Sequence, residues 1–279
     1  MTQIHWFPGH MKKALNNITE KIKLVDVVIE ILDARAPLSS MNPDLEQAIK
    51  HKKRLAVLSK ADLADPEQTK LWSEELKKEF DAFVIANLTD PKSTKIISEQ
   101  VSKLGEEKHQ KEKAKGMKPQ PIKAMIIGIP NVGKSSLINR VANRKAAGVQ
   151  NKPGYTRGEQ FIKVNNDFIL LDTPGVLPMN YDDKKRATNI ALLGSIREDI
   201  LPNDVLVKSL LYILREYYPL SLKERYGIEE IKDDEAVKQN IATRRGLLTM
   251  GELDIKKAEI VLLKDFKDGK LGRITLDRK

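Results

Sequence analysis

A phosphate-binding loop restricts the possible folds of this chain more than any other stretch. Residues 128–135, GIPNVGKS, fit the pattern G-x-x-x-x-G-K-[ST] at every position. The loop follows an apolar run at 122–130 and precedes a helical pattern at 134–144, which is the strand–loop–helix context in which this motif works. Gly128 and Gly133 let the backbone curl so that its N–H groups point at phosphate oxygens. The sequence therefore predicts a nucleotide site at the end of a strand.

The residues of this loop have distinct expected roles. Lys134 supplies a cation to the β- and γ-phosphates and acts in catalysis through this contact, and Ser135 supplies a hydroxyl for Mg²⁺. The helix that begins here adds the positive end of its dipole. We expect the nucleotide to contact Asn131, Val132, Gly133, Lys134, Ser135 and Ser136.

Two later stretches are expected to complete the phosphate and metal contacts. DTPG at 172–175 ends the second apolar run after the loop. Asp172 can hold Mg²⁺ through water, and the Gly175 N–H can meet the γ-phosphate. Between them lies NKPGYTRG at 151–158. A Thr is needed there for the metal and the γ-phosphate, and Thr156 is the natural candidate.

A base-recognition motif lies upstream of the phosphate loop. SKAD at 59–62 is similar to the guanine reader of GTPases, usually written Asn-Lys-x-Asp. Guanine presents donors at N1 and N2 that the Asp62 carboxylate can accept, whereas adenine has an acceptor at N1. The Lys60 stem can lie across the base. One strand later, Ala86 and Asn87 are expected to add a backbone and a side-chain contact. The predicted ligands are therefore GTP and GDP.

The order of these motifs is unusual, because the base reader precedes the phosphate loop. This order predicts a circularly permuted GTPase. The three-dimensional site can be unchanged, since only the chain ends and one connector move. The connector is expected at about 105–121, a charged segment that ends in Gly and two prolines.

Strand and helix patterns alternate through the first two thirds of the chain. This alternation predicts an α/β fold, a mostly parallel sheet with helices on both faces. Strands are expected at 25–33, 55–62, 82–87, 122–130, 161–164 and 168–175. From about Pro178 the patterns are helical only. We expect a GTPase domain at 1–177 and a small all-helical, RNA-binding domain at 178–279.

Composition narrows the class of partner. The chain has 49 Lys+Arg and 39 Asp+Glu, a net charge of +10, which makes a polyanionic partner plausible. The absence of cysteine excludes disulfides and thiolate metal sites, and we expect no metal cluster. The N-terminal stretch lacks the apolar core of a signal peptide, and no apolar run could span a bilayer. We therefore expect a cytoplasmic protein without a membrane partner.

The chain resembles the circularly permuted GTPases of ribosome assembly. The matching stretches are WFPGHM (6–11), DARAPLSSMNP (33–43), SKADL (59–63), GIPNVGKSSLIN (128–139), NKPGYTRG (151–158), LDTPG (171–175) and RRGLL (244–248). They are spread over nearly the whole chain. The resemblance implies a GTP-hydrolysing factor that binds the immature large ribosomal subunit and its rRNA and leaves after hydrolysis. We expect a monomer away from the ribosome.

With this resemblance, basic side chains of the helical domain are expected to contact RNA phosphates. They are Lys184, Lys185, Arg186, Arg244, Arg245, Lys256, Lys257, Lys264, Lys267, Lys270 and Arg273. A second basic patch comprises Lys50, Lys52, Lys53, Arg54 and the connector lysines.

One residue departs from the family pattern. Ser59 stands where the family usually has Asn. A Ser hydroxyl is shorter than an Asn amide and has fewer hydrogen-bonding groups. We expect guanine affinity to be weaker than in an Asn version, by about 1–2 kcal/mol if a buried hydrogen bond is lost.

The group that promotes hydrolysis is left open by the sequence. Val176 follows DTPG, where many GTPases carry a Gln that orients the attacking water. His10, aimed by the Pro8-Gly9 turn, is one candidate, and the resemblance supports it. A K⁺ ion is another, because Asn131 resembles the Asn that helps coordinate K⁺ in potassium-activated GTPases. Ribosomal RNA is a third.

Two other function classes stay open. One is a nucleotide-dependent RNA-binding switch whose hydrolysis is supplied entirely by the partner. The other is an ATP-using kinase or ATPase, against which Asp62 argues because adenine would not satisfy its carboxylate.

Overall fold

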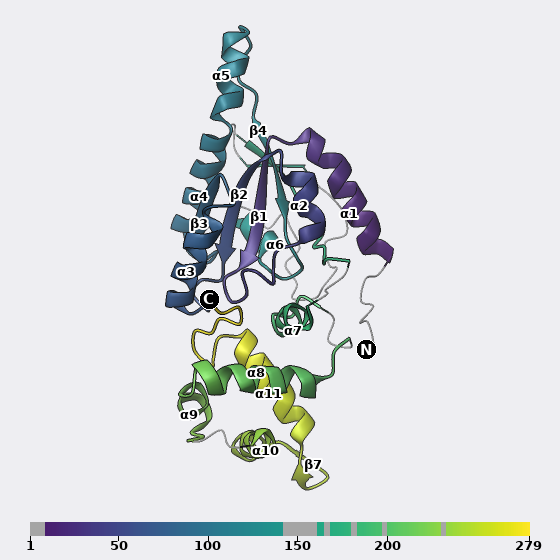
Figure 1. Ribbon diagram of the computed structural model, residues 1–279, viewed down its shortest axis with the longest axis vertical. Helices are drawn as coiled ribbons and strands as arrows, with labels where there is room; N and C mark the ends of the chain where they lie inside the picture. Colours follow the sequence, from purple (N-terminus) through teal and green to yellow (C-terminus); the bar gives the residue numbers. More distant parts are fainter. Residues whose placement is uncertain (1–8, 142–160, 165–167, 180–182, 197–199, 230–232) are drawn as a thin grey trace.

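The computed structural model describes residues 9–141, 161–164, 168–179, 183–196, 200–229 and 233–279. A sheet flanked by helices forms one part of the molecule, and a group of helices forms a second part below it (Figure 1). A helical arm projects from the opposite end of the sheet (Figure 1).

The main sheet contains six strands in the order β3-β2-β1-β4-β6-β5. All neighbouring pairs are parallel except β5 and β6, which are antiparallel. The bounds are β1 Val27–Asp33, β2 Lys53–Ser59, β3 Ala82–Ile85, β4 Ile122–Ile127, β5 Phe161–Lys163 and β6 Phe168–Leu171. The predicted mostly parallel sheet is confirmed. Strands β2, β3, β4 and β6 end earlier than expected, because the residues after Ser59, Ile85, Ile127 and Leu171 leave the sheet.

Both faces of the sheet are covered, as a parallel sheet requires. Along β1, Val28 and Leu32 face one side, and Ile29 and Ile31 belong to the larger core on the other. The first face packs against α1 (Gly9–Lys21), α2 (Pro43–Ile49) and α3 (Pro66–Leu76). The second packs against α4 (Pro91–Leu104) and α6 (Lys134–Val141). A short 3₁₀ turn, Ile22–Leu24, leads from α1 to β1.

The chain after Pro178 is mainly helical, as predicted. Its helices are α7 (Lys184–Leu192), α8 (Asn203–Tyr217), α9 (Ser221–Tyr226), α10 (Asp234–Arg245) and α11 (Ile255–Lys267). The expectation that it contains no strand was wrong. Strands β7 (Leu248–Thr249) and β8 (Glu252–Leu253) form a hairpin. Met250 and Gly251 both have positive φ, 53° and 85°. A two-residue hairpin with a type I′ turn requires positive φ at both central residues.

The C-terminal tail returns from the helices to the sheet. The Ile274 N–H donates to the Leu63 carbonyl at 3.1 Å, and the Leu276 N–H donates to the Arg35 carbonyl at 2.6 Å. Asp277 accepts from the Ser39 hydroxyl at 2.6 Å and from the Asn189 amide at 2.9 Å. This cluster joins the tail, α7 and the loop after β1. The boundary at 177/178 stays a prediction, and the tail contacts cross it.

The connector differs in form from the expectation. Residues Glu106–Ala114 form a helix, α5, in the arm at the top of Figure 1. A Glu107–Lys111 ion pair at 2.6 Å, one helical turn apart, supports it. Sequence reasoning missed the helix because it has no apolar face and no buried residue.

Among the described residues, no helix is long and apolar enough to cross a membrane.

Leu276→Ala tests the packing of the tail. Leu276 is fully buried, so the substitution is expected to lower the free energy of unfolding by about 2–5 kcal/mol. Ile260→Ala, at a residue 54% exposed on α11, is the control and is expected to change it by only ~0.5 kcal/mol. Urea unfolding measures both. Equal losses would mean that the tail does not pack on the sheet as described.

Candidate functional site

The motif residues meet at one edge of the sheet. Asp33 ends β1 and Ser59 ends β2, while Gly128 and Asp172 directly follow β4 and β6. These strands are parallel, so their carboxyl ends lie together. Ligands of open α/β sheets bind at this edge. The permuted chain order therefore brings these motif residues to one edge of the sheet.

The phosphate loop is closed around its own lysine. The Lys134 Nζ donates to the carbonyls of Gly128 at 3.1 Å and Ile129 at 2.7 Å. Burial lowers the pKa of Lys134 to about 8, although the nearby Asp172 carboxylate opposes this shift. Gly175 lies against the loop, where a Cβ would stand 2.8 Å from the Pro130 backbone and 2.9 Å from the Lys134 Nζ. DTPG and the phosphate loop are thus in direct contact.

Asp172 has the features of a ligand for a metal-bound water. It is 4% exposed, and its Oδ1 has no hydrogen-bond partner among the described residues. Burial raises its pKa to about 6, against the effect of Lys134 and of the Thr173 N–H. A buried carboxylate oxygen without a partner needs a cation or a donor. Ser135 lies in the first turn of α6, and Thr156 lies outside the described residues.

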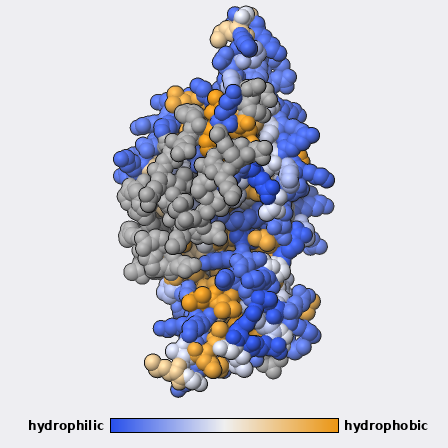
Figure 2. Space-filling view, turned by 180° about the vertical axis from the view of Figure 1, so that it is seen from behind, coloured by the Kyte–Doolittle hydropathy of each residue, from blue (hydrophilic) through white to orange (hydrophobic). Residues whose placement is uncertain are grey.

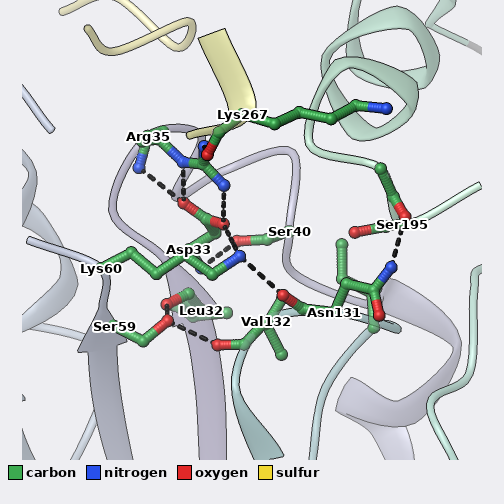
Figure 3. Close-up of polar contacts among 12 residues, drawn as sticks. Leu32, Asp33, Arg35, Ser40, Ser59, Lys60, Asn131, Val132, Ser195 and Lys267 are labelled. Carbon is green, nitrogen blue, oxygen red and sulfur yellow. Dashed lines mark hydrogen bonds and ion pairs between the residues drawn. The ribbon is translucent and has the colours of Figure 1, made fainter. Parts of the chain in front are cut away.

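The base reader and the phosphate loop are linked through Lys60. Lys60 adopts a left-handed conformation, φ 54°. Its Nζ donates to the Asn131 carbonyl at 2.6 Å and to the Asp33 carboxylate at 2.8 Å (Figure 3). Asp62, two residues on, is exposed. The lysine is therefore held by the protein, while the carboxylate that would read the base is open to a ligand.

Asp33 is a central residue that sequence reasoning did not assign to the site. Its carboxylate is fully buried and accepts from the Arg35 Nε and Nη2 at 3.0 and 2.9 Å, as well as from Lys60. The Arg35 and Lys60 cations hold the pKa of Asp33 well below its usual range, although burial acts in the opposite direction. Asp33 is the first residue of DARAPLSSMNP, one of the stretches that resemble the family. The residue types in this stretch do not by themselves indicate a chemical role for Asp33.

Ser59 retains part of the bridge expected of an Asn. Its hydroxyl lies 2.6 Å from the Val132 carbonyl and 2.9 Å from the Leu32 carbonyl (Figure 3). A hydroxyl has one proton and donates to one of these oxygens at a time. The contact to the phosphate loop is therefore present. The hydroxyl proton that would be needed for a further contact to the base is already used.

The loop after β3 lies beside the base reader. The Ala61 N–H donates to the Ala86 carbonyl at 3.5 Å, so the predicted neighbourhood is present. The Ala86 N–H already donates to the Leu58 carbonyl at 2.9 Å. The Asn87 Oδ1 accepts from the N–H and hydroxyl of Thr89. Contacts of Ala86 and Asn87 with the base stay predictions, and these polar groups would have to exchange partners.

The phosphate loop also touches the helical part directly. The Asn131 Nδ2 donates to the Gly194 carbonyl at 2.5 Å, and the Ser195 hydroxyl donates to the Pro130 carbonyl at 2.7 Å. A third contact runs from the Arg35 Nη1 to the Lys267 carbonyl at 3.2 Å, at the end of α11. Three hydrogen bonds therefore join the nucleotide edge to the segment after α7 and to α11.

Comparisons with known proteins identify the family of this chain. A family model described as a 50S ribosome-binding GTPase matches residues 123–239. The chain is 42% identical over 280 residues to ribosome biogenesis GTPase A of Bacillus cereus, covering 98% of this chain and 93% of that protein. The chain belongs to the ribosome biogenesis GTPase A family. It is therefore a GTPase, and the fold class and the permuted arrangement predicted from the sequence are confirmed.

Other members and neighbours of the ribosome biogenesis GTPase A family extend the similarity. Mitochondrial ribosome-associated GTPase 1 of Xenopus tropicalis is 33% identical, covering 98% of this chain and 94% of that protein. GNP-bound YlqF from Thermotoga maritima has a TM-score of 0.68 at 26% identity, covering 95% of this chain and 98% of that chain. A GDP-bound YlqF structure gives 0.67 at the same identity.

Two positions near DTPG and in α1 bear on how hydrolysis is promoted. The Val176 side chain has no polar group to orient water, and it is fully buried, while its carbonyl accepts from the Asn42 Nδ2 at 2.9 Å. His10 lies in the first turn of α1, and its side chain lies outside the described residues. Its catalytic role stays a prediction.

The predicted RNA-binding residues fall into two groups. Lys184, Lys185 and Arg186 lie in the first turn of α7, where the two lysines are exposed, and the others lie on α10, on α11 and beyond. Several of these side chains make intramolecular hydrogen bonds. The Arg186 Nη2 donates to the Leu38 carbonyl at 2.8 Å, and Arg273 donates to the Ala64 and Ala61 carbonyls, both at 2.8 Å. Further intramolecular partners are held by Arg244, Arg245, Lys257 and Lys270.

Asp33→Asn tests whether the buried carboxylate positions the base reader. It leaves two cations without a counter-charge, so a loss of about 3–5 kcal/mol in stability is expected. Lys60 also loses its anchor, so GDP affinity of the folded protein should fall about tenfold, or roughly 1.4 kcal/mol. Fluorescent GDP titration measures this. Ile241→Ala, at a fully buried residue of α10, should be destabilised but should keep its affinity; equal affinity in both variants would rule out the positioning role.

Ser59→Asn tests whether Ser in place of the family's usual Asn weakens GDP binding. An amide can donate to the Val132 carbonyl and still present an oxygen or a second N–H to the base. GDP affinity should rise by about 1 kcal/mol, roughly fivefold. Ser59→Ala should lose affinity, because it leaves the Val132 carbonyl unpaired. Unchanged or weaker GDP binding by the Asn variant would count against this account.

Proposed function

We propose that this GTPase is an assembly factor for the large ribosomal subunit. In its GTP state it binds immature subunits and their rRNA, and hydrolysis stimulated by the subunit releases it. Support comes from the relatives named for ribosome biogenesis and from the family model named for 50S binding. Such a role belongs in the cytoplasm, and we expect a monomer away from the ribosome.

The observation that carries the release step is the direct bonding between phosphate loop and helical part. Asn131 donates to Gly194, and Ser195 donates to Pro130. The loop must open to admit phosphates, because the Lys134 ammonium now bonds to loop carbonyls. Any change of the Pro130–Asn131 backbone would act on the segment between α7 and α8. Nucleotide state and RNA-binding helices are thereby coupled.

The segment after DTPG offers a second coupling route. The Asn42 amide holds the Val176 carbonyl, and the Met179 N–H donates to the Asp44 carboxylate at 2.6 Å. This segment leads into α7, whose Arg186 binds the Leu38 and Met41 carbonyls. A γ-phosphate contact at Gly175 would shift the position of the segment after DTPG and, through it, that of α7. Allosteric coupling of this kind requires two states that differ in these contacts.

Mg²⁺ and K⁺ are the proposed inorganic cofactors. Ser135, Thr156 and Asp172 would hold Mg²⁺, Asp172 through water, and this ion would neutralise phosphate charge. The buried, unpartnered Oδ1 of Asp172 fits this assignment. K⁺ would bind at Asn131, whose amide nitrogen is used by Gly194, which leaves Oδ1 for the ion. His10, K⁺ and ribosomal RNA remain compatible contributors to hydrolysis.

A nucleotide-dependent RNA-binding switch with little hydrolytic chemistry of its own is the second candidate. The burial of Val176 favours it, because no side chain directly after DTPG can orient water. His10→Ala separates the two. Undiminished subunit-stimulated hydrolysis in this variant would support the switch.

The deciding experiment is GTP turnover with and without immature large subunits, in K⁺ and in Na⁺. We expect stimulation by immature large subunits well above that by mature small subunits, and a loss in Na⁺ if a cation binds at Asn131. Asn131→Asp, which also changes the bond to Gly194, serves as the variant for the cation site. If subunits change nothing, the GTPase assignment stands and the assembly function loses its support.

A further inference from the structure

The projecting arm, residues 106–121, makes no contribution to the core. None of the residues of α5 is buried. Gly105 and Ile122, which flank the arm, touch each other: a Cβ on Gly105 would stand 2.3 Å from the Ile122 side chain. The chain thus leaves the sheet and returns to the same place. A few residues would close this gap, and ordering a longer excursion costs conformational entropy.

The arm is nevertheless built as a defined structure. The Lys108 ammonium donates to the Asp26 carboxylate at 2.9 Å and fixes its base to the start of β1. The Glu112 carboxylate accepts from the Gln120 N–H at 2.9 Å, and the His109 Nε2 lies 2.9 Å from the Gln120 carbonyl. The return segment is therefore bonded to α5. These contacts hold the arm away from the sheet (Figure 1).

The charges of the arm are distributed unevenly. Near its base, Lys108 and Lys111 are paired with acidic residues. Towards the tip, Lys113, Lys115 and Lys118 are exposed and have no ion-pair partner among the residues that the structure describes. Figure 2 shows a mostly hydrophilic surface over the arm. A protein-binding hot spot needs aromatic or apolar anchors, and of these the arm offers only Met117, 51% exposed.

A basic groove continues from the arm onto the sheet. It has a volume of about 470 Å³ and lies between α5 and the amino ends of β1 and β2. Its lining includes Lys52, Lys53, Lys108, Lys111 and Lys115 together with Asp26, Glu107 and Glu112, so lysines outnumber acidic residues by five to three. This is the edge opposite to the nucleotide site, since Lys53 begins β2 and Ser59 ends it.

We infer that the arm and its groove bind the phosphate backbone of RNA. Unpaired lysines on a rigid projection suit phosphate contacts, which position a protein without reading sequence. This inference deepens the proposed function, on which it rests for the ribosomal origin of the RNA. It gives the protein a second RNA contact, at the end of the sheet remote from GTP, which adds to the contacts of the helical domain.

The test compares two triple variants with equal change of net charge. The arm variant carries Lys113→Glu, Lys115→Glu and Lys118→Glu. The control carries Lys70→Glu, Lys77→Glu and Lys92→Glu, three exposed lysines on α3, directly after α3 and on α4. A third variant replaces residues 106–121 with three glycines. The probes are transcribed large-subunit rRNA, an unrelated RNA duplex of 20 base pairs, and purified immature large subunits.

We expect the arm variant and the short-arm variant to bind both RNAs at least tenfold more weakly than the control variant. Each lost phosphate contact lowers the magnitude of the slope of log affinity against log salt by about 0.7–0.9, so three should lower it by about 2.1–2.7. Intrinsic GTP hydrolysis and the melting temperature should match the wild type, because the arm lies away from the site and the core.

Each other outcome decides the matter. Equal RNA binding by arm and control variants, or no RNA binding by the wild type, overturns the inference. Loss of subunit binding with normal RNA binding would assign the arm to a ribosomal protein and also overturn it. Arm-specific RNA binding by a wild type that fails to bind subunits would uphold the inference and defeat the assembly function instead.

Discussion

The nucleotide edge of this protein depends on one buried carboxylate, that of Asp33. It lies between Arg35 and Lys60, and each of these cations makes a further bond to a carbonyl oxygen. Through Lys60 it reaches the phosphate loop at Asn131, and through Arg35 it reaches the end of α11 at Lys267. A buried ion cluster is stable only when all its members are paired. Base reader, phosphate loop and helical part are therefore held in one mutual arrangement.

Circular permutation leaves this arrangement intact because the site consists of strand ends. Parallel strands bring their carboxyl ends to one edge whatever their order in the chain. Permutation changes the opposite edge of the sheet, where the connector joins the two positions that are chain termini in an unpermuted GTPase. There the connector forms an arm and a basic groove instead of a short link. The two edges thus have separate chemistry, GTP at one and a charged projection at the other.

Much of the site could be predicted from local patterns. The phosphate loop, SKAD and DTPG were identified from residue type and spacing, and the structure brings them together. The arm helix was missed because it has no apolar stripe, and the β7–β8 hairpin because its strands have only two residues each. No role could be assigned to Asp33 and Arg35 from the sequence. Their spacing of two residues indicates neither that they form an ion pair nor that Lys60 and Lys267 are their distant partners.

The chemistry of this protein can be read from short stretches of its chain. A loop that binds phosphate and a carboxylate that selects guanine need particular residues at short spacings, and short spacings are visible in a chain. Tertiary structure alone decided how these pieces are held. Ser59 donating to Val132, Asn131 bonding to Gly194 and Leu276 returning to Arg35 join residues far apart in sequence. Such contacts follow from packing and burial, which depend on the whole fold.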